Sequence, residues 1–303
     1  MPRISFLPTI LRETLGARTL PREPEPDLVM TNDEQVAVYA ASGRIDGVMA
    51  AAYLFHSAHA SEVIQGYREV IDLGCGPATQ LAQIAQFNPE TEFRGIDLSE
   101  PMLEKARAHV AELGLRNVTF SRGDVARLDF VPDRSADGVI SMMAFHHLPT
   151  REHLSRCFQE IRRVLKPGGA LYLVDFGRLK SLKSVIFFAN MNAAHQPHLL
   201  SLDYERSLRA AFLFEDFKAL GAEELGPVAR VYGTFLVPVL TLIQTRAKPI
   251  STELRGRLRA MRRALPRRYR ADLDDMRLFF RLGGLPSDAF RRAKPDSKSP
   301  QWR

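Results

Sequence analysis

The sequence is most informative at residues 69–79, which read Glu69-Val70-Ile71-Asp72-Leu73-Gly74-Cys75-Gly76-Pro77-Ala78-Thr79. The apolar residues at the start of this segment favour a buried strand. The two glycines that follow adopt backbone conformations that other residues resist. The segment therefore predicts a strand that passes through a tight loop into a helix. A nucleotide-like ligand can approach the main chain closely there, near the positive end of the helix.

A second apolar strand is expected at residues 93–97, and it ends in an acid, Asp97, 21 residues after Gly76. A carboxylate at a strand end can accept hydrogen bonds from ribose hydroxyls. A glycine loop followed by such an acid is common to dinucleotide sites and S-adenosylmethionine sites. The dinucleotide fingerprint needs a third glycine further along the loop, whereas this loop continues as Pro77-Ala78-Thr79. The loop departs from the dinucleotide fingerprint, but by itself it leaves both kinds of site open.

Strands and helices alternate from residue 69 onward. We expect further strands at residues 118–121, 137–142, 170–176, 228–232 and 235–245. Helices are expected between them, with Ser99 and Thr150 as N-caps. This alternation predicts an α/β fold with a doubly wound, mostly parallel, seven-stranded sheet.

The chain divides into three regions on the same reading. Residues 1–65 are expected to form an N-terminal arm and lid helices, and residues 66–248 the ligand-binding domain. Residues 177–220 interrupt the alternation and predict a helical cap inserted in that domain. Residues 249–303 predict a basic helical extension, since they carry 15 Lys and Arg against 6 Asp and Glu. This excess exceeds the net charge of the whole chain, +7. It suits nucleic acid, anionic lipid or an acidic protein, unless it is only a solvated helix face.

The composition, with 45% hydrophobic and 25% charged residues, is that of a soluble globular protein. The two cysteines, Cys75 and Cys157, make a disulfide framework improbable and fit a reducing compartment, so we expect a cytoplasmic protein. No Cys and His spacing typical of a metal site occurs, and no metal is expected. No apolar run approaches the roughly 20 residues of a spanning helix, so no transmembrane segment is expected.

Four sequence blocks together resemble the class I S-adenosylmethionine-dependent methyltransferases, in their order and spacing. The blocks are Asp72-Leu73-Gly74-Cys75-Gly76, Gly95-Ile96-Asp97-Leu98-Ser99, Gly123-Asp124-Val125 and Arg163-Val164-Leu165-Lys166-Pro167-Gly168-Gly169. The likeness covers about residues 66–176. It implies a Rossmann-like methyltransferase fold with S-adenosyl-L-methionine as the cofactor. The sequence departs from the family's loop at Ala78, where many members have a third glycine.

The resemblance implies a cofactor site made of Tyr39, Asp72, Gly74, Gly76, Asp97, Leu98, Asp124, Val125 and Ser141. In the family's roles, Asp97 would hold the ribose hydroxyls, Leu98 would pack on adenine, and Asp124 would accept from its amino group. The two glycines would let the loop approach the cofactor. Asp72 would orient the loop or reach the amino group of the cofactor through water. Each acid also has a structural alternative: Asp72 could be purely structural, Asp97 could be only a neighbour of the helix-capping Ser99, and Asp124 could be an ordinary turn residue.

Methyl transfer from a sulfonium is an in-line displacement in which the protein positions the acceptor. A general base is needed only if the acceptor must lose a proton. The candidates are His146 and His147, directly after the strand at 137–142, although adjacent histidines can also be structural there. Weaker candidates in the insertion are His195, His198 and Tyr204.

The apolar residues of the insertion favour a small, apolar or lipid-like acceptor, unless they only form the core of the cap itself. Those residues are Ile186, Phe187, Phe188, Met191, Leu199, Leu200, Phe212, Phe214 and Phe217. An acidic carrier protein could deliver such an acceptor to the basic C-terminal region. A nucleic-acid methyltransferase is one alternative. However, Ser141-Met142-Met143-Ala144 lacks the Asn/Asp-Pro-Pro-aromatic motif of enzymes that methylate base amines. A non-catalytic cofactor-binding scaffold is the other alternative, and the oligomeric state stays open.

Overall fold

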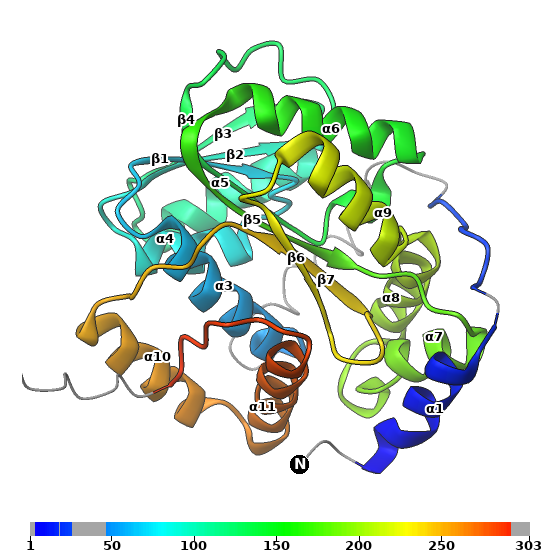
Figure 1. Ribbon diagram of the computed structural model, residues 1–303. Coiled ribbons are helices and arrows are strands. Elements are labelled where there is room, and N and C mark those ends of the chain that lie inside the picture. The colour runs from blue at the N-terminus through cyan, green and yellow to red at the C-terminus, as the bar shows by residue number, and fades with distance from the viewer. Residues whose placement is uncertain (1–3, 18, 26–46, 292–303) are drawn as a thin grey trace, which may run out of the picture.

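The computed structural model describes residues 4–17, 19–25 and 47–291 (Figure 1). Within these residues a seven-stranded sheet has the order β3-β2-β1-β4-β5-β7-β6. Its strands are β1 (Glu69–Leu73), β2 (Glu92–Asp97), β3 (Val118–Arg122), β4 (Ala136–Met142), β5 (Leu165–Phe176), β6 (Arg230–Gly233) and β7 (Leu240–Gln244). All neighbours are parallel except β7, which runs antiparallel to both β5 and β6. The predicted doubly wound, mostly parallel sheet is confirmed.

The sheet reverses its direction of winding between β1 and β4, and this position determines where a ligand can bind. β1 pairs with β2 on one side and with β4 on the other, so the strand order runs outward in both directions from this pair. In open parallel sheets, ligands bind at the carboxyl ends of the strands where the order reverses. The glycine loop after β1 and the histidine pair after β4 therefore lie at the same edge.

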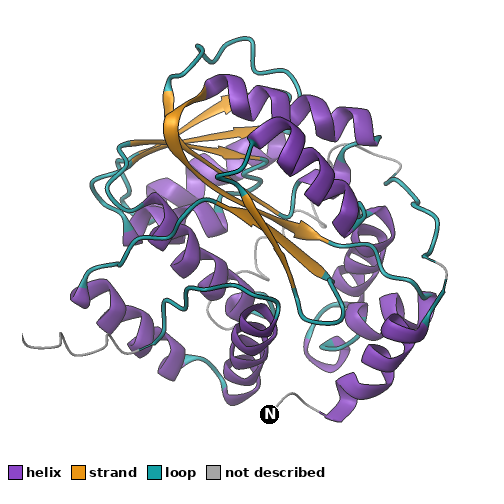
Figure 2. Ribbon diagram, viewed as in Figure 1, coloured by secondary structure: helices purple, strands orange, loops and turns teal. Residues whose placement is uncertain are grey.

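Helices cover both faces of the sheet (Figures 1 and 2). One face packs against α3 (Ala50–Ile64), α4 (Thr79–Phe87) and α5 (Glu100–Glu112), and the other against α6 (Arg151–Val164) and α9 (Phe214–Leu220). Val70 of β1 belongs to the first core and Ile71 to the second, as strand alternation requires. Both expected N-caps are confirmed, because Ser99 Oγ accepts from the Met102 N–H and Thr150 Oγ1 from the His153 N–H.

The region where the sequence predicts a cap contains α7 (Leu182–Ala189), α8 (His198–Ala210) and α9, with the short turn η3 (Ala193–His195) between the first two. Only α7 and α8 contribute to the ligand cavity described below. Phe212 and Phe217 instead lie 6.3 Å apart between ring centroids, and Phe217 lies 6.5 Å from Phe158 of α6. The expectation that these two phenylalanines face the acceptor is therefore wrong, because α9 is a helix that covers the sheet.

The two ends of the described chain pack on the domain. At the C-terminal end, α10 (Thr252–Ala264) leads to α11 (Arg267–Leu282), where Phe280 stacks on Phe55 of α3 at 5.2 Å. At the N-terminal end, η1 (Ile4–Phe6) and α1 (Leu7–Leu15) run beside α7. The Phe6 ring lies 5.8 Å from Phe187 and 5.7 Å from Phe279, so it joins α1, α7 and α11. No helix in the described ranges has the length and apolarity needed to cross a membrane.

Candidate active site

The glycine loop after β1 presents bare backbone to the sheet edge. Gly74 and Gly76 have φ angles of 71° and 52°, in the left-handed region that favours glycine. The N–H groups of Gly74 and Cys75 both donate to the carbonyl oxygen of Ile96, at 2.8 and 3.2 Å, which fixes the loop on β2. A Cβ on Gly74 would lie 2.3 Å from the Ala144 Cβ, whereas a Cβ on Gly76 would meet nothing within 4 Å. Gly74 therefore allows close packing, and Gly76 borders open space.

A cavity of about 270 Å³ lies at this edge, between the domain and the cap. Six of the nine expected cofactor residues line it: Gly74, Gly76, Asp97, Leu98, Asp124 and Val125. The opposite wall comes from α7 and α8 and includes Phe188, Leu200, Asp203 and Tyr204. Tyr39, the expected lid residue, lies outside the described residues. The loop and strand ends that the sequence singled out are thus brought together around one cavity.

Two expected site residues lie beneath the cavity rather than in its wall. Asp72 is 6% exposed, and its burial, together with the nearby charge of Asp97, raises its pKa well above the ordinary value. Ser141 is fully buried and donates to the carbonyl oxygen of Leu73 at 2.7 Å, which ties β4 to β1. Met143, which follows β4 with a φ of 56°, lines the cavity in place of Ser141 and Met142.

The other two expected cofactor acids, Asp97 and Asp124, each hold a loop and also line the cavity. Asp97 Oδ2 accepts from the Gly76 N–H at 2.8 Å, and its Oδ1 accepts from the Ser99 N–H at 2.9 Å. Burial raises the pKa of Asp97, although these hydrogen bonds oppose the shift. Asp124 Oδ1 accepts from the Ala126 N–H at 2.8 Å. Asp97 thus contacts the helix-capping Ser99 and Asp124 holds its own turn, and both residues also line the cavity.

The charges around the cavity favour a cation. Three carboxylates, Asp97, Asp124 and Asp203, line it, and its described lining includes neither Lys nor Arg. A dinucleotide carries two phosphates that need donors or positive charge, which helix N-termini and basic side chains supply elsewhere. A ligand with a positively charged centre is instead attracted by three acids in a partly buried site. The wall thus suits a sulfonium better than a pyrophosphate.

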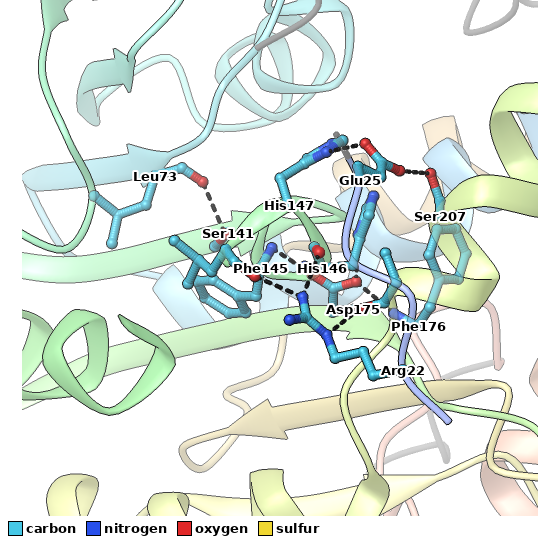
Figure 3. A network of polar contacts seen from close by, with 12 residues as sticks. Arg22, Glu25, Leu73, Ser141, Phe145, His146, His147, Asp175, Phe176 and Ser207 are labelled. Atoms are coloured by element: carbon cyan, nitrogen blue, oxygen red, sulfur yellow. Dashed lines mark hydrogen bonds and ion pairs between the residues drawn. The ribbon is translucent and has the colours of Figure 1, made fainter. Parts of the chain in front are cut away.

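Asp175 of β5 holds the histidine loop, η2 (Phe145–His147), against the sheet (Figure 3). Its Oδ2 accepts from the N–H groups of Phe145 and His146, and its Oδ1 lies 2.7 Å from Nδ1 of His146. Because a carboxylate only accepts, Nδ1 of His146 carries the proton and Nε2 is the basic nitrogen. The His146 side chain is 3% exposed, so it is the more enclosed of the two histidines.

A segment from the N-terminal region holds His147 (Figure 3). Nδ1 of His147 lies 2.6 Å from Oε2 of Glu25, whose Oε1 accepts from the Ser207 hydroxyl of α8 at 2.9 Å. Burial alone would lower the pKa of His147, but the hydrogen bond and charge of Glu25 outweigh it and raise that pKa. Burial also opposes ionisation of Glu25, but His147 lowers the pKa of Glu25 to about 2. The His147 side chain is 35% exposed and lines the cavity.

Arg22 fastens the same segment to the histidine loop. Its guanidinium donates to the carbonyl oxygens of His146, Leu148, Pro149 and Ala210. Burial lowers the pKa of Arg22 to about 10. Arg22 and Glu25 were not among the residues expected at the site, because they fall in the region 1–65 that was expected to form only an arm and lid helices. The available signal was a charged run, Arg22-Glu23-Pro24-Glu25, between prolines.

Of the three weaker candidates for the general base, one lines the cavity and two do not. Tyr204 lines the cavity, and burial raises its pKa to about 12. His195 and His198 are exposed and lie outside the cavity wall. One atom each from Glu25, His146 and His147 lies within 4.8 Å of the others, the spacing of a loose metal site. Both Nδ1 atoms are already hydrogen-bonded to carboxylates, so hydrogen bonding accounts for the cluster, and the absence of a metal stays a prediction.

Comparison with known proteins identifies relatives of the central segment. Residues 70–169 match the family described as methyltransferase domain. Over 109 residues the chain is 38% identical to a 27-O-demethylrifamycin SV methyltransferase of Amycolatopsis mediterranei, covering 35% of this chain and 38% of that protein. A demethylmenaquinone methyltransferase of Listeria monocytogenes is 36% identical over 113 residues, covering 37% and 46%. The chain thus spans less than half the length of these curated relatives.

The fold has solved counterparts. The plantazolicin methyltransferase BpumL, whose structure was determined in complex with SAH, matches with a TM-score of 0.53 and 15% sequence identity. The match covers 85% of this chain and 90% of that chain. At this level of identity the likeness concerns the fold alone. It agrees with the strand order and the mostly parallel sheet described above.

Proposed function

We propose that the protein transfers a methyl group from S-adenosylmethionine to a small, apolar acceptor. The match of residues 70–169 to the family described as methyltransferase domain supports this activity. The observation that carries this proposal is the single cavity bordered by the glycine loop, three acids and the histidine pair. The names of the two curated relatives refer to small acceptors, demethylrifamycin and demethylmenaquinone, which supports the same acceptor class here.

In this proposal the domain side of the cavity holds the cofactor. Asp97 accepts from the ribose hydroxyls, Leu98 and Val125 contact adenine, and Asp124 accepts from its amino group. Gly76 leaves the room that a side chain would fill. When bound, S-adenosylmethionine supplies an electrophilic methyl group on a sulfonium, and the acidic wall suits that positive charge.

The cap side holds the acceptor. Phe188, Leu200 and Tyr204 offer apolar contact, so the acceptor buries its hydrocarbon surface there. The reacting group of the acceptor lies next to the histidine loop, beside His147. Burial of the apolar surface of the acceptor orients that group for an in-line displacement.

We assign the general base to His147. Glu25 holds the proton on Nδ1, so Nε2 is the nitrogen that takes the proton from an acceptor hydroxyl. Glu25 also stabilises the charged ring that results, in the way that carboxylates orient catalytic histidines. Burial opposes the shift, but the hydrogen bond and charge of Glu25 raise the pKa of His147 above that of a free imidazole, which makes Nε2 the stronger proton acceptor. His146, enclosed and bound to Asp175, positions the loop.

A methyl-transfer assay tests this assignment. The purified protein is incubated with methyl-labelled S-adenosylmethionine and a set of hydrophobic phenols and hydroxyquinones. We expect transfer to at least one member, and a loss of about 10²- to 10⁴-fold in kcat for His147→Gln, the range for removing a general base. SAH affinity should not change in this variant. An exposed histidine provides the control, and His195→Gln should retain full activity. No transfer to any acceptor despite SAH binding would favour the scaffold alternative.

A further inference from the structure

A second cavity of about 170 Å³ adjoins the first. The two cavities share wall residues, among them Met49, Met143, Phe188 and Tyr204. The second cavity extends away from the glycine loop, under α1, α7, α11 and the turn between β6 and β7. Since the shared residues come from several elements, the two spaces form neighbouring compartments of one site.

The second cavity is built by parts of the chain outside the matched methyltransferase segment. Of the residues that line it, only Met143 lies within residues 70–169. Most of its wall is apolar, including Ile10, Val237, Met276 and Phe279. The contacts of Phe6 with Phe187 and Phe279 fix α1, α7 and α11 around it. The polar members of its wall are Thr9, Asn192, Thr234, Asp272 and Asp275.

The histidine pair is found only in the first cavity. His147, Asp203 and the cofactor acids line the first cavity and not the second, whose own carboxyl groups are Asp272 and Asp275 of α11. A ligand that spans both spaces therefore places a protic head near His147 and hydrocarbon under α11. The volume indicates the size of that hydrocarbon, since an apolar cavity of about 150 Å³ is known to bind benzene. The second cavity thus has room for roughly six carbon atoms.

We propose that the acceptor carries an apolar arm of about six carbon atoms, and that this second cavity, the arm cavity, binds it. The inference rests on the proposed function and narrows its substrate class to a protic head group with a hydrocarbon arm. The arm cavity selects acceptors by arm length, because each buried methylene group adds about fourfold to the affinity until the cavity is full.

Calorimetric titration of 4-alkylphenols into the protein saturated with SAH tests the inference. The probes run from 4-methylphenol to 4-octylphenol. For the wild type, we expect the affinity to rise about fourfold per methylene up to about the hexyl compound and then to level off. Met276→Trp fills the arm cavity, and the levelling-off should occur at shorter arms. Met276→Ala enlarges it, and the levelling-off should move to longer arms.

The control is Leu282→Trp, on the same helix but 49% exposed and outside the cavity wall. It should behave as the wild type does. Affinity that is independent of arm length, or a length dependence that neither Met276 variant alters while SAH still binds, would overturn the arm cavity alone. Failure of SAH to bind, with the length dependence intact, would contradict the proposed function but leave the arm cavity standing.

Discussion

Glycine is required at positions 74 and 76 of the loop after β1 for different structural reasons, and experiment can separate them. Both have a positive φ, so alanine at either position costs about 1 kcal/mol or more of backbone strain. Gly74→Ala also forces its Cβ to 2.3 Å from Ala144, whereas Gly76→Ala meets nothing within 4 Å. We expect Gly74→Ala to destabilise the fold by at least about 2 kcal/mol more in urea unfolding. Equal effects of the two variants would contradict the close packing at Gly74.

The pair of Glu25 and His147 should give the protein a measurable pH dependence. The pKa of Glu25 falls from 4.5 to about 2 on folding, so its stabilisation is present above pH 4.5 and is lost as the pH falls toward 2. The pKa of His147 rises above 6.5, so its stabilisation is present below that pH and is lost as the pH rises through the raised value. Both contributions are therefore greatest between about pH 4.5 and 6.5.

Glu25→Gln should remove most of this stabilisation. Unfolding by urea should separate wild type and variant most at pH 5.5, and less as the pH rises through the raised pKa of His147. The rise of kcat with pH should also move to lower pH in the variant, because His147 loses its carboxylate partner. A kinetic profile that stays in place would remove Glu25 from the catalytic arrangement.

For individual residues, local sequence signals predicted part of the site. The positive φ of Gly74 and Gly76 and the position of Asp97 at a strand end depend on neighbours in the chain, which a sequence motif records. The contact between Glu25 and His147 joins residues 122 positions apart, and no local pattern encodes it. The depth of Asp72 and Ser141 beneath the cavity was also hidden, since alternation along a strand does not reveal how deep its last residues lie.

The N-terminal segment that contains Arg22 fastens the histidine loop by hydrogen bonds from outside the segment that matches the methyltransferase domain. Arg22 donates to four carbonyl oxygens, three of them in and after η2. Hydrogen bonds from a charged donor contribute about 1.5–3 kcal/mol each, so Arg22→Ala should cost about 2–4 kcal/mol after allowance for solvent access and relaxation. Arg209→Ala, which removes an exposed ion pair between α8 and Glu23, should cost less than about 1 kcal/mol. Chemical denaturation of both variants measures the difference.

The elements followed the sequence closely where periodicity and caps agreed, as in α5 and α6. The strand expected at 170–176 begins earlier, at Leu165, because β5 includes Pro167-Gly168-Gly169. These residues fall where the pairing of β5 with β4 shifts register. The role of α9 was missed for a different reason. Its phenylalanines are as apolar as those of α7, and only tertiary packing decides which of them face a ligand.

Across the whole molecule, the C-terminal region is basic and the wall of the cavity is acidic. The basic C-terminal region uses part of its charge within the chain: Arg262 and Arg277 pair with Asp274, and Arg277 also pairs with Asp288. The pair of Arg262 and Asp274 joins α10 to α11, and that of Arg277 and Asp288 joins α11 to the segment that follows it. These pairs leave less free positive charge for an external partner than the sequence suggested. The cavity has the opposite character, with three acids in its wall.

The central claim is that this cavity binds S-adenosylmethionine, and calorimetric titration with SAH tests it most directly. We expect micromolar binding of SAH by the wild type, and no binding of NAD, whose phosphates the acidic wall disfavours. In Asp97→Ala, loss of hydrogen bonds to a charged acceptor should weaken SAH binding by about 1–3 kcal/mol. Asp97→Asn keeps the shape of the side chain and should lose less. Binding of NAD but not SAH, or an SAH affinity that Asp97→Ala leaves unchanged, would contradict the account.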